Sequence, residues 1–113
     1  ESSGTFSFGS TGKYLLMYQA FGFTNSNANE NQIWIDWSVD NFSNTITISN
    51  AGMGPSSADA TEFGNATATA IVDVTNTSTH KFKLAVSATA SFNWAGDSTK
   101  TRTGVIAIRL GDT

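Results

Sequence analysis

The chain has 113 residues, the length of one domain, and contains no Cys, which excludes disulfide bonds, thiolate metal sites and a cysteine nucleophile. Six basic and nine acidic residues give a formal net charge of −3 without a basic run, so nucleic-acid binding is not expected. No apolar run approaches the roughly 20 residues of a membrane helix, so membrane insertion is not expected either. Thr, Ser, Asn, Gly and Ala dominate the remainder, which is the composition of an all-β protein with polar turns.

The first predicted elements are two strands joined by a turn. Thr5–Phe8 alternates apolar and polar residues and predicts a short strand, and residues 9–12 predict the turn. Gly12–Phe23 is bulky and rich in β-formers, which predicts a long strand. Both faces of this strand are apolar: one carries Tyr14, Leu16, Tyr18 and Ala20, and the other carries Leu15, Met17, Phe21 and Phe23.

A strand that is apolar on both faces has to be covered on both faces. The second sheet of a small sandwich covers one face of the segment at 12–23. The other face requires either a long loop of the same chain or another copy of the chain. We expect another copy of the chain.

The middle of the chain predicts two strands and a long loop. Residues 32–39 alternate cleanly: the inward face carries Ile33, Ile35, Trp37 and Val39, and the outward face carries Trp34, Asp36 and Ser38. Residues 40–44 predict a turn, and residues 45–49 predict the next strand. Residues 50–63 have no period and predict a surface loop, the kind of segment in which binding sites tend to lie.

The C-terminal half predicts a hairpin and a last strand. Residues 65–75 and 80–90 alternate on either side of the polar turn 76–78, so we expect them to pair as a long hairpin. Residues 92–94 extend or cap this hairpin, and residues 95–102 predict a polar loop. Thr103–Leu110 predicts a strand that is also apolar on both faces, and we expect it beside the strand at 12–23. Seven or eight strands of this length predict an antiparallel β-sandwich, and a jelly roll fits their number.

The polar residues predict no catalytic site, no metal site and no cofactor. His80 is the one His of the chain and falls on the apolar face of its strand, so we expect a packed, hydrogen-bonded imidazole in the core or in an interface. A serine-hydrolase nucleophile motif Gly-x-Ser-x-Gly does not occur. Asp97 and Asp112 lie near loop ends, where solvated turn acids are expected rather than Ca²⁺ ligands.

Trp34 and Asp36 form the candidate ligand-binding site. Trp34 is the Trp whose strand phase points it away from the predicted core, and Asp36 lies on the same face. An exposed ring stacks on a sugar while a neighbouring carboxylate binds the hydroxyls. Subunit contact or packing at the rim of the sheet is the alternative role. The pair, together with the loop 50–63, makes a carbohydrate- or receptor-binding module the alternative function of the chain.

Several segments resemble a known superfamily. The stretches Gly4–Phe8 and Gly12–Ala20 resemble the opening "T-F-x-F-x-x-x-G-x-Y-x-x-x-x-x-A" of the trimeric jelly rolls of the complement globular-head and tumour-necrosis-factor superfamily. Val72–Lys81 and Ile106–Asp112 resemble the version of this domain found in marine bacteriophage virion structural proteins. The resemblance spans most of the chain.

The resemblance implies a single jelly-roll domain over residues 1–113 that forms a homotrimer. It implies a non-enzymatic structural protein of a bacteriophage virion, a capsid-decoration or tail-fibre domain that stabilises the extracellular particle or mediates attachment. Its partners would be its own copies, other virion proteins and a host-surface glycan or receptor. The family usually has one more upstream strand beside the last one, so the chain is a fragment or a neighbouring subunit supplies that strand. With the doubly apolar strands, this predicts a trimer interface of Tyr14, Leu16, Tyr18, Phe82, Leu84, Ile106 and Ile108.

Overall fold

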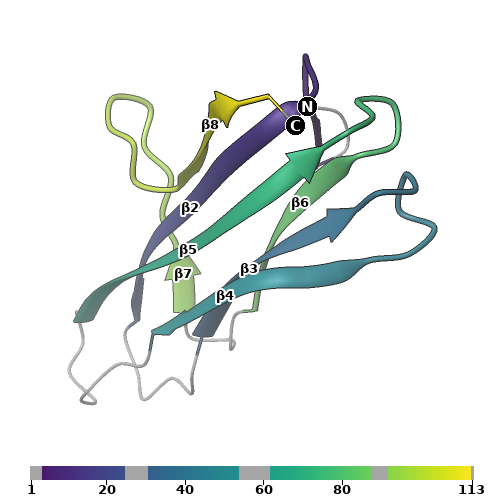
Figure 1. Cartoon of the computed structure of the whole chain (residues 1–113). Coiled ribbons are helices and arrows are strands. Elements are labelled where there is room, and N and C mark those ends of the chain that lie inside the picture. The colour runs from purple at the N-terminus through teal and green to yellow at the C-terminus, as the bar shows by residue number, and fades with distance from the viewer. Residues whose placement is uncertain (1–3, 25–30, 54–61, 88–91, 113) are drawn as a thin grey trace.

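The computed structural model describes residues 4–24, 31–53, 62–87 and 92–112. In these ranges the chain is all-β: it forms eight antiparallel strands and no helix, as the composition predicts (Figure 1). The strands are β1 (Thr5–Ser7), β2 (Gly12–Thr24), β3 (Asn31–Ser38), β4 (Ile46–Met53), β5 (Glu62–Val74), β6 (Lys81–Val86), β7 (Phe92–Trp94) and β8 (Gly104–Gly111).

The strands form two antiparallel sheets that stack as a β-sandwich. The first sheet has the order β1-β6-β3-β4. In the second sheet β2 is central: β5 pairs along one edge, while β8 and β7 share the other edge (Figure 1). β8 pairs with residues 13–19 of β2, and β7 pairs with residues 22–24. The expectation that the last strand lies beside the strand at 12–23 is therefore confirmed.

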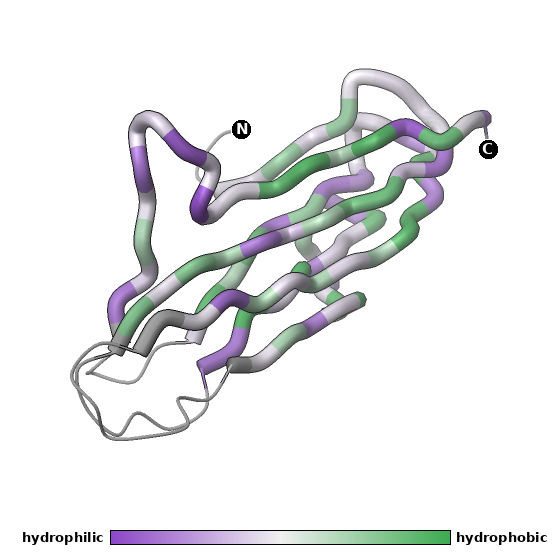
Figure 2. The backbone as a smooth tube through the Cα atoms, turned by 90° about the vertical axis from the view of Figure 1, so that its left-hand side faces the viewer, coloured by the Kyte–Doolittle hydropathy of each residue, from purple (hydrophilic) through white to green (hydrophobic). Residues whose placement is uncertain are grey.

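The core lies between the sheets and follows from the period of two along each strand. Leu16 of β2 is fully buried, as are Ile33 and Ile35 of β3 and Val74 of β5. Figure 2 shows hydrophobic and hydrophilic residues recurring along strands of both layers. Aromatic rings fill one part of this core: Phe8 lies 4.7 Å from the ring of Tyr14 and 5.9 Å from that of Trp37.

The predicted hairpin over residues 65–90 is wrong. β5 pairs with β2 in the second sheet, whereas β6 pairs with β1 and β3 in the first. The chain between them crosses from one sheet to the other through a turn in which the His80 amide donates to the Asn76 carbonyl at 2.9 Å. An alternating sequence indicates only that one face of each strand meets the core. Two strands paired in a hairpin and two strands in facing sheets both have such a sequence, so alternation does not distinguish them.

The end of β3 differs from expectation. The strand ends at Ser38, which is buried, and Val39 beyond it is 51% exposed, so both residues lie opposite to their predicted faces.

Strand β4 also differs from expectation. It continues to Met53, past the predicted end at Ser49, because residues 50–53 pair with the start of β3. Residues 54–61 of the predicted loop lie outside the described ranges, and its last two residues, 62–63, begin β5. Ala51 packs against the core, which explains why this polar, glycine-containing stretch is held in the sheet.

Candidate functional site

The outward face of the second sheet carries a group of apolar side chains that this chain leaves exposed or half-buried. We name it the outer apolar face; its members are Leu15 and Met17 of β2, Ile71 of β5, and Ile106 and Ile108 of β8. Neighbouring positions on β2 are buried in the core, so the period of two turns these residues outward. The side chains of Ile71, Ile106 and Ile108 are 68%, 55% and 46% exposed.

The strand register makes this face continuous. Leu15 stands opposite Ile71 on one side and Ile108 on the other, and Met17 stands opposite Ile106. Directly opposed side chains on one face of an antiparallel pair are in contact distance, about 5 Å between Cβ atoms. The five residues therefore form one patch across three strands. Exposed apolar patches rimmed by polar residues mark interaction surfaces.

Polar residues bound this face along β2. The next outward rung toward the start of β2 pairs Lys13 with Asp73. Two rungs past Leu15 in the other direction, Gln19 pairs with Thr67. All four side chains are exposed. The apolar patch is therefore limited in length to about two rungs and ends in groups that remain hydrated.

Strand β8 contributes two exposed members of the face, Ile106 and Ile108. Residues 106–110 are all exposed, on both sides of the strand. Within the described ranges β8 pairs with β2 alone, so its second edge presents backbone donors and acceptors without a strand partner. An apolar edge strand of this kind is a template for association with another chain.

The structure corrects the face chosen for the predicted trimer interface. Tyr14, Leu16, Tyr18 and Phe82 are buried in the interior of the same chain, and Leu84 packs against that core. Burial raises the pKa of the Tyr18 hydroxyl. A doubly apolar strand indicates that both of its faces favour burial, but it does not indicate which face meets the chain's own second sheet. Ile106 and Ile108 do lie on the exposed face.

Ile71 belongs to the outer apolar face but was not among the predicted interface residues. The sequence places it between Thr69 and Asp73, on the polar face of its strand. The one indication in the sequence is an apolar residue on a face that otherwise carries threonines and an aspartate. It indicates an apolar patch only when its cross-strand neighbour Leu15 is known, and the pattern of a single strand does not give that neighbour.

One end of the same sheet face is covered by the chain itself. The β7–β8 connection is joined to β2: the Ala95 amide donates to the Phe21 carbonyl at 2.8 Å, and the Phe21 amide donates to the Thr103 hydroxyl at 3.2 Å. The Arg102 guanidinium lies 5.5 Å from the centroid of the Phe21 ring. The alternative that a loop covers the second face of β2 therefore holds at Phe21, whereas Leu15 and Met17 lie beyond it.

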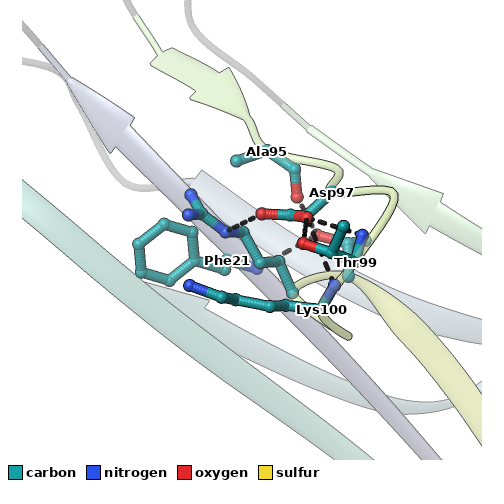
Figure 3. Close-up of polar contacts among 7 residues, drawn as sticks. Phe21, Ala95, Asp97, Thr99 and Lys100 are labelled. Atoms are coloured by element: carbon teal, nitrogen blue, oxygen red, sulfur yellow. Dashed lines mark hydrogen bonds and ion pairs between the residues drawn. The ribbon is translucent and has the colours of Figure 1, made fainter.

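Asp97 organises this connection (Figure 3). Its carboxylate accepts hydrogen bonds from the backbone amide of Thr99 at 2.8 Å, from the Thr99 hydroxyl at 2.8 Å and from the Lys100 amide at 3.2 Å. These bonds, led by that of the Thr99 amide, lower the pKa of Asp97, and the Arg102 guanidinium at 3.1 Å adds to the effect. Asp97 thus acts in loop structure, as expected of a turn acid.

Trp34 and Asp36 lie together on the outward face of the first sheet. The Trp34 indole Nε1–H donates to Asp36 Oδ2 at 3.2 Å. The Thr47 hydroxyl donates to Asp36 Oδ1 at 2.7 Å across the strand pair. A β-bulge opposite Asp36 brings Thr47 into that position. The sequence-predicted pair is thus in direct contact, and both side chains are half-buried.

His80 is a buried, hydrogen-bonded imidazole, as predicted. Its Nδ1 lies 3.1 Å from the Thr79 hydroxyl and its Nε2 lies 3.2 Å from the Thr75 hydroxyl. The ring meets that of Trp37 edge-on at 5.6 Å. Both nitrogens are therefore occupied by hydroxyl groups of the turn between β5 and β6, and the side chain fixes that turn.

The described residues contain no group of three or more His, Cys, Asp or Glu side chains placed to hold a metal ion. None of the segments in the described ranges is a helix long and apolar enough to cross a membrane. Comparison with protein-family models and with curated proteins gave no match for this chain. The candidate surfaces are thus the outer apolar face and the Trp34–Asp36 pair, argued from their own chemistry.

Proposed function

We propose that this chain is a non-enzymatic structural subunit of a bacteriophage virion, a jelly-roll domain that self-associates as a homotrimer in a capsid decoration or tail fibre. Its role is to stabilise the particle or to mediate attachment, in contact with its own copies and other virion proteins. The observation that carries the proposal is the outer apolar face.

The energetics of that face support association. Moving apolar surface out of water contributes about 25 cal/mol per Å². Ile71, Ile106 and Ile108 each leave about half or more of the side chain in water. A monomer that exposes them beside one another gains free energy when a second apolar surface covers them. A copy of the same chain supplies such a surface of equal size.

The threefold symmetry and the virion location rest on the resemblance to the trimeric jelly rolls. The segments that carry it include Gly12–Ala20 and Ile106–Asp112, which contain Leu15, Met17, Ile106 and Ile108. The motif likeness and the apolar face therefore involve the same two strands, β2 and β8. The absence of an enzymatic role is proposed because the one His of the chain packs against Trp37 in the turn before β6.

Mass in solution tests the self-association. Analytical ultracentrifugation at micromolar concentration is expected to give three times the 11.9 kDa mass of the chain. Ile108→Asp places a charge within the face, beside Leu15, and is expected to give a monomer with an unchanged β-sheet circular dichroism spectrum. A wild-type protein that stays monomeric at these concentrations would refute the trimer.

Ile46→Asp is the matched control for this experiment. Ile46 is 61% exposed but begins β4 of the other sheet, outside the outer apolar face. The same chemical change there is expected to leave the mass unchanged. Dissociation by both variants would mean that added charge, rather than the face, controls assembly. Labelling the chain in purified virus particles and imaging them tests the virion location separately.

A further inference from the structure

The outward face of the first sheet differs in kind from the outer apolar face. Along β3, Gln32, Trp34 and Asp36 point outward, while Ile33 and Ile35 are fully buried. The outward residues of the neighbouring strands are polar or small. Trp34 is therefore the one large aromatic surface among polar groups on the part of β3 that the structure describes.

The Trp34 ring is held in place by its hydrogen bond. Its one polar group, Nε1–H, is used by Asp36, so the rest of the indole offers only carbon surface. Asp36 is itself fixed by Thr47, which links β3 to β4. An aromatic side chain anchored at its polar edge loses little conformational entropy when a ligand packs on it.

The groups around the ring are suited to hydroxyl groups. Asn50 on β4 and Ala85 on β6 stand opposite Trp34, one with an amide and the other with a side chain too short to cover the ring. The Asp36 carboxylate has about four acceptor positions, of which the two hydrogen bonds use two. About two acceptor positions therefore remain for the hydroxyl groups of a ligand.

Local charge selects the ligand class. Lys83 on β6 stands opposite Asp36, and its ammonium lies 4.2 Å from the centroid of the Phe42 ring. The one carboxylate and the one ammonium nearest to Trp34 balance each other. The next cation on this face of β6, Lys81, lies one rung further away and donates to Asn41 Oδ1. A neutral ligand with an apolar face and several hydroxyls fits it better than an anion or a cation.

We propose that Trp34, Asp36 and Asn50 form a binding site for neutral hexopyranose units of an oligosaccharide. The C–H face of the sugar packs on the indole ring, Asp36 accepts hydrogen bonds from two hydroxyls, and the Asn50 amide contacts a third. The site lies on the opposite side of the sandwich from the outer apolar face. Self-association and sugar binding therefore use different sheets and do not compete.

Solution NMR tests this inference on the full chain. The three Trp residues give three indole N–H signals, and Trp34→Phe identifies that of Trp34. Cellotetraose, mannotetraose, tetra-N-acetylchitotetraose and lactose serve as neutral probes, with sialyllactose and tetramethylammonium as charged comparators. At least one neutral probe is expected to shift the Trp34 signal saturably, with a dissociation constant of about 1 mM or below, and to leave the Trp37 and Trp94 signals in place.

Variants then assign the contacts. Trp34→Ala is expected to weaken binding of the active probe at least tenfold. Asp36→Asn keeps the shape of the site and is expected to weaken it about three- to tenfold. Ala85→Gln adds bulk beside the ring and blocks it without touching the pair. The last two keep the test informative if Trp34→Ala does not fold. Thr67→Ala, on the outward face of the other sheet, is the control and leaves the affinity unchanged.

Three results would overturn the proposal. One is the absence of any shift with neutral probes up to about 10 mM. Another is binding that survives both Asp36→Asn and Ala85→Gln in folded protein. The third is a response to sialyllactose or tetramethylammonium alone, which would indicate a charged ligand. Ile108→Asp is expected to keep the affinity per site, so a failed trimer and a failed sugar site give different outcomes.

Discussion

Gly12, at the start of β2, has a backbone angle that only glycine adopts without strain. Its φ is +141°, and a Cβ atom there would lie 2.5 Å from the Gly111 carbonyl oxygen and 2.7 Å from Arg109 Nε. The close approach belongs to the β-bulge between β2 and β8, where Arg109 Nε–H also donates to the Thr11 carbonyl at 3.0 Å. The register of β8, and with it the outer apolar face, depends on this residue.

Gly12→Ala is therefore expected to lower the free energy of unfolding by about 1–3 kcal/mol. Urea denaturation followed by Trp fluorescence measures it. Gly9→Ala is the matched control, because a Cβ at Gly9 meets nothing within 4 Å. It is expected to be neutral or slightly stabilising. Equal loss in both variants would show that the backbone at Gly12 is not the cause.

The turn after β3 depends on a buried hydroxyl and one carboxylate. Asn41 and Phe42 both have positive φ, 59° and 66°, which is unfavourable for a bulky residue. The Ser38 hydroxyl accepts the Phe42 amide at 2.8 Å and donates to Asp40 at 2.8 Å. Asp40 in turn accepts the backbone amide of Asn44 at 2.9 Å, and this bond leads the causes that lower the pKa of Asp40.

Both Asp40 and Asp97 have folded-state pKa values below their ordinary value, so their contribution to stability is present above about pH 4 and is lost as pH falls through the folded pKa. The thermal unfolding midpoint is expected to decrease as the pH is lowered from about 5 to about 2. The Asp40→Asn/Asp97→Asn variant is expected to show a shallower fall over that interval, by differential scanning fluorimetry. An unchanged slope would mean that other acids govern the acid response.

At the scale of the element, β2 presents two apolar faces with different roles. Leu16 is fully buried, whereas its neighbour Leu15 belongs to the outer apolar face. The chain with Ile108→Asp is expected to be monomeric and separates the two roles. In that chain, Leu16→Ala is expected to lower the free energy of unfolding by about 2–5 kcal/mol. Leu15→Ala is expected to lower it by less than about 1 kcal/mol. In the otherwise wild-type chain, Leu15→Ala is instead expected to weaken association. A large loss of monomer stability from Leu15→Ala would place it in the core.

The sequence predicts most strands correctly because their side chains alternate. It does not predict how strands pair, and β5 with β6 is the clearest instance. Val72, Val74 and Phe82 all point into the core, which a hairpin and a crossover between sheets satisfy alike. Pairing is decided by contacts far apart in the chain, such as Tyr14 opposite Val72, which a local pattern does not contain.

At the scale of the molecule, the same limit explains the candidate sites. Trp34 and Asp36 are two residues apart on one strand, so the strand period alone brings them together and the sequence predicts their contact. The outer apolar face contains residues of β2, β5 and β8. Two of them, Leu15 and Ile108, are 93 positions apart in the sequence. Its existence was predictable from the doubly apolar strands, but its membership required the register.

The two polar ends of the outer apolar face lead to the last prediction. If apolar contact drives association, sodium sulfate should lower the dissociation constant of the oligomer, and cooling from about 25 °C to 5 °C should raise it. Sodium chloride up to about 0.5 M should have little effect, because screening acts mainly on exposed charges such as Lys13 and Asp73. Sedimentation velocity measures each dependence. Lys13→Gln is the control and should leave the effect of sodium sulfate unchanged. If sodium chloride dissociates the oligomer, the charged pair Lys13–Asp73 rather than apolar contact holds it together.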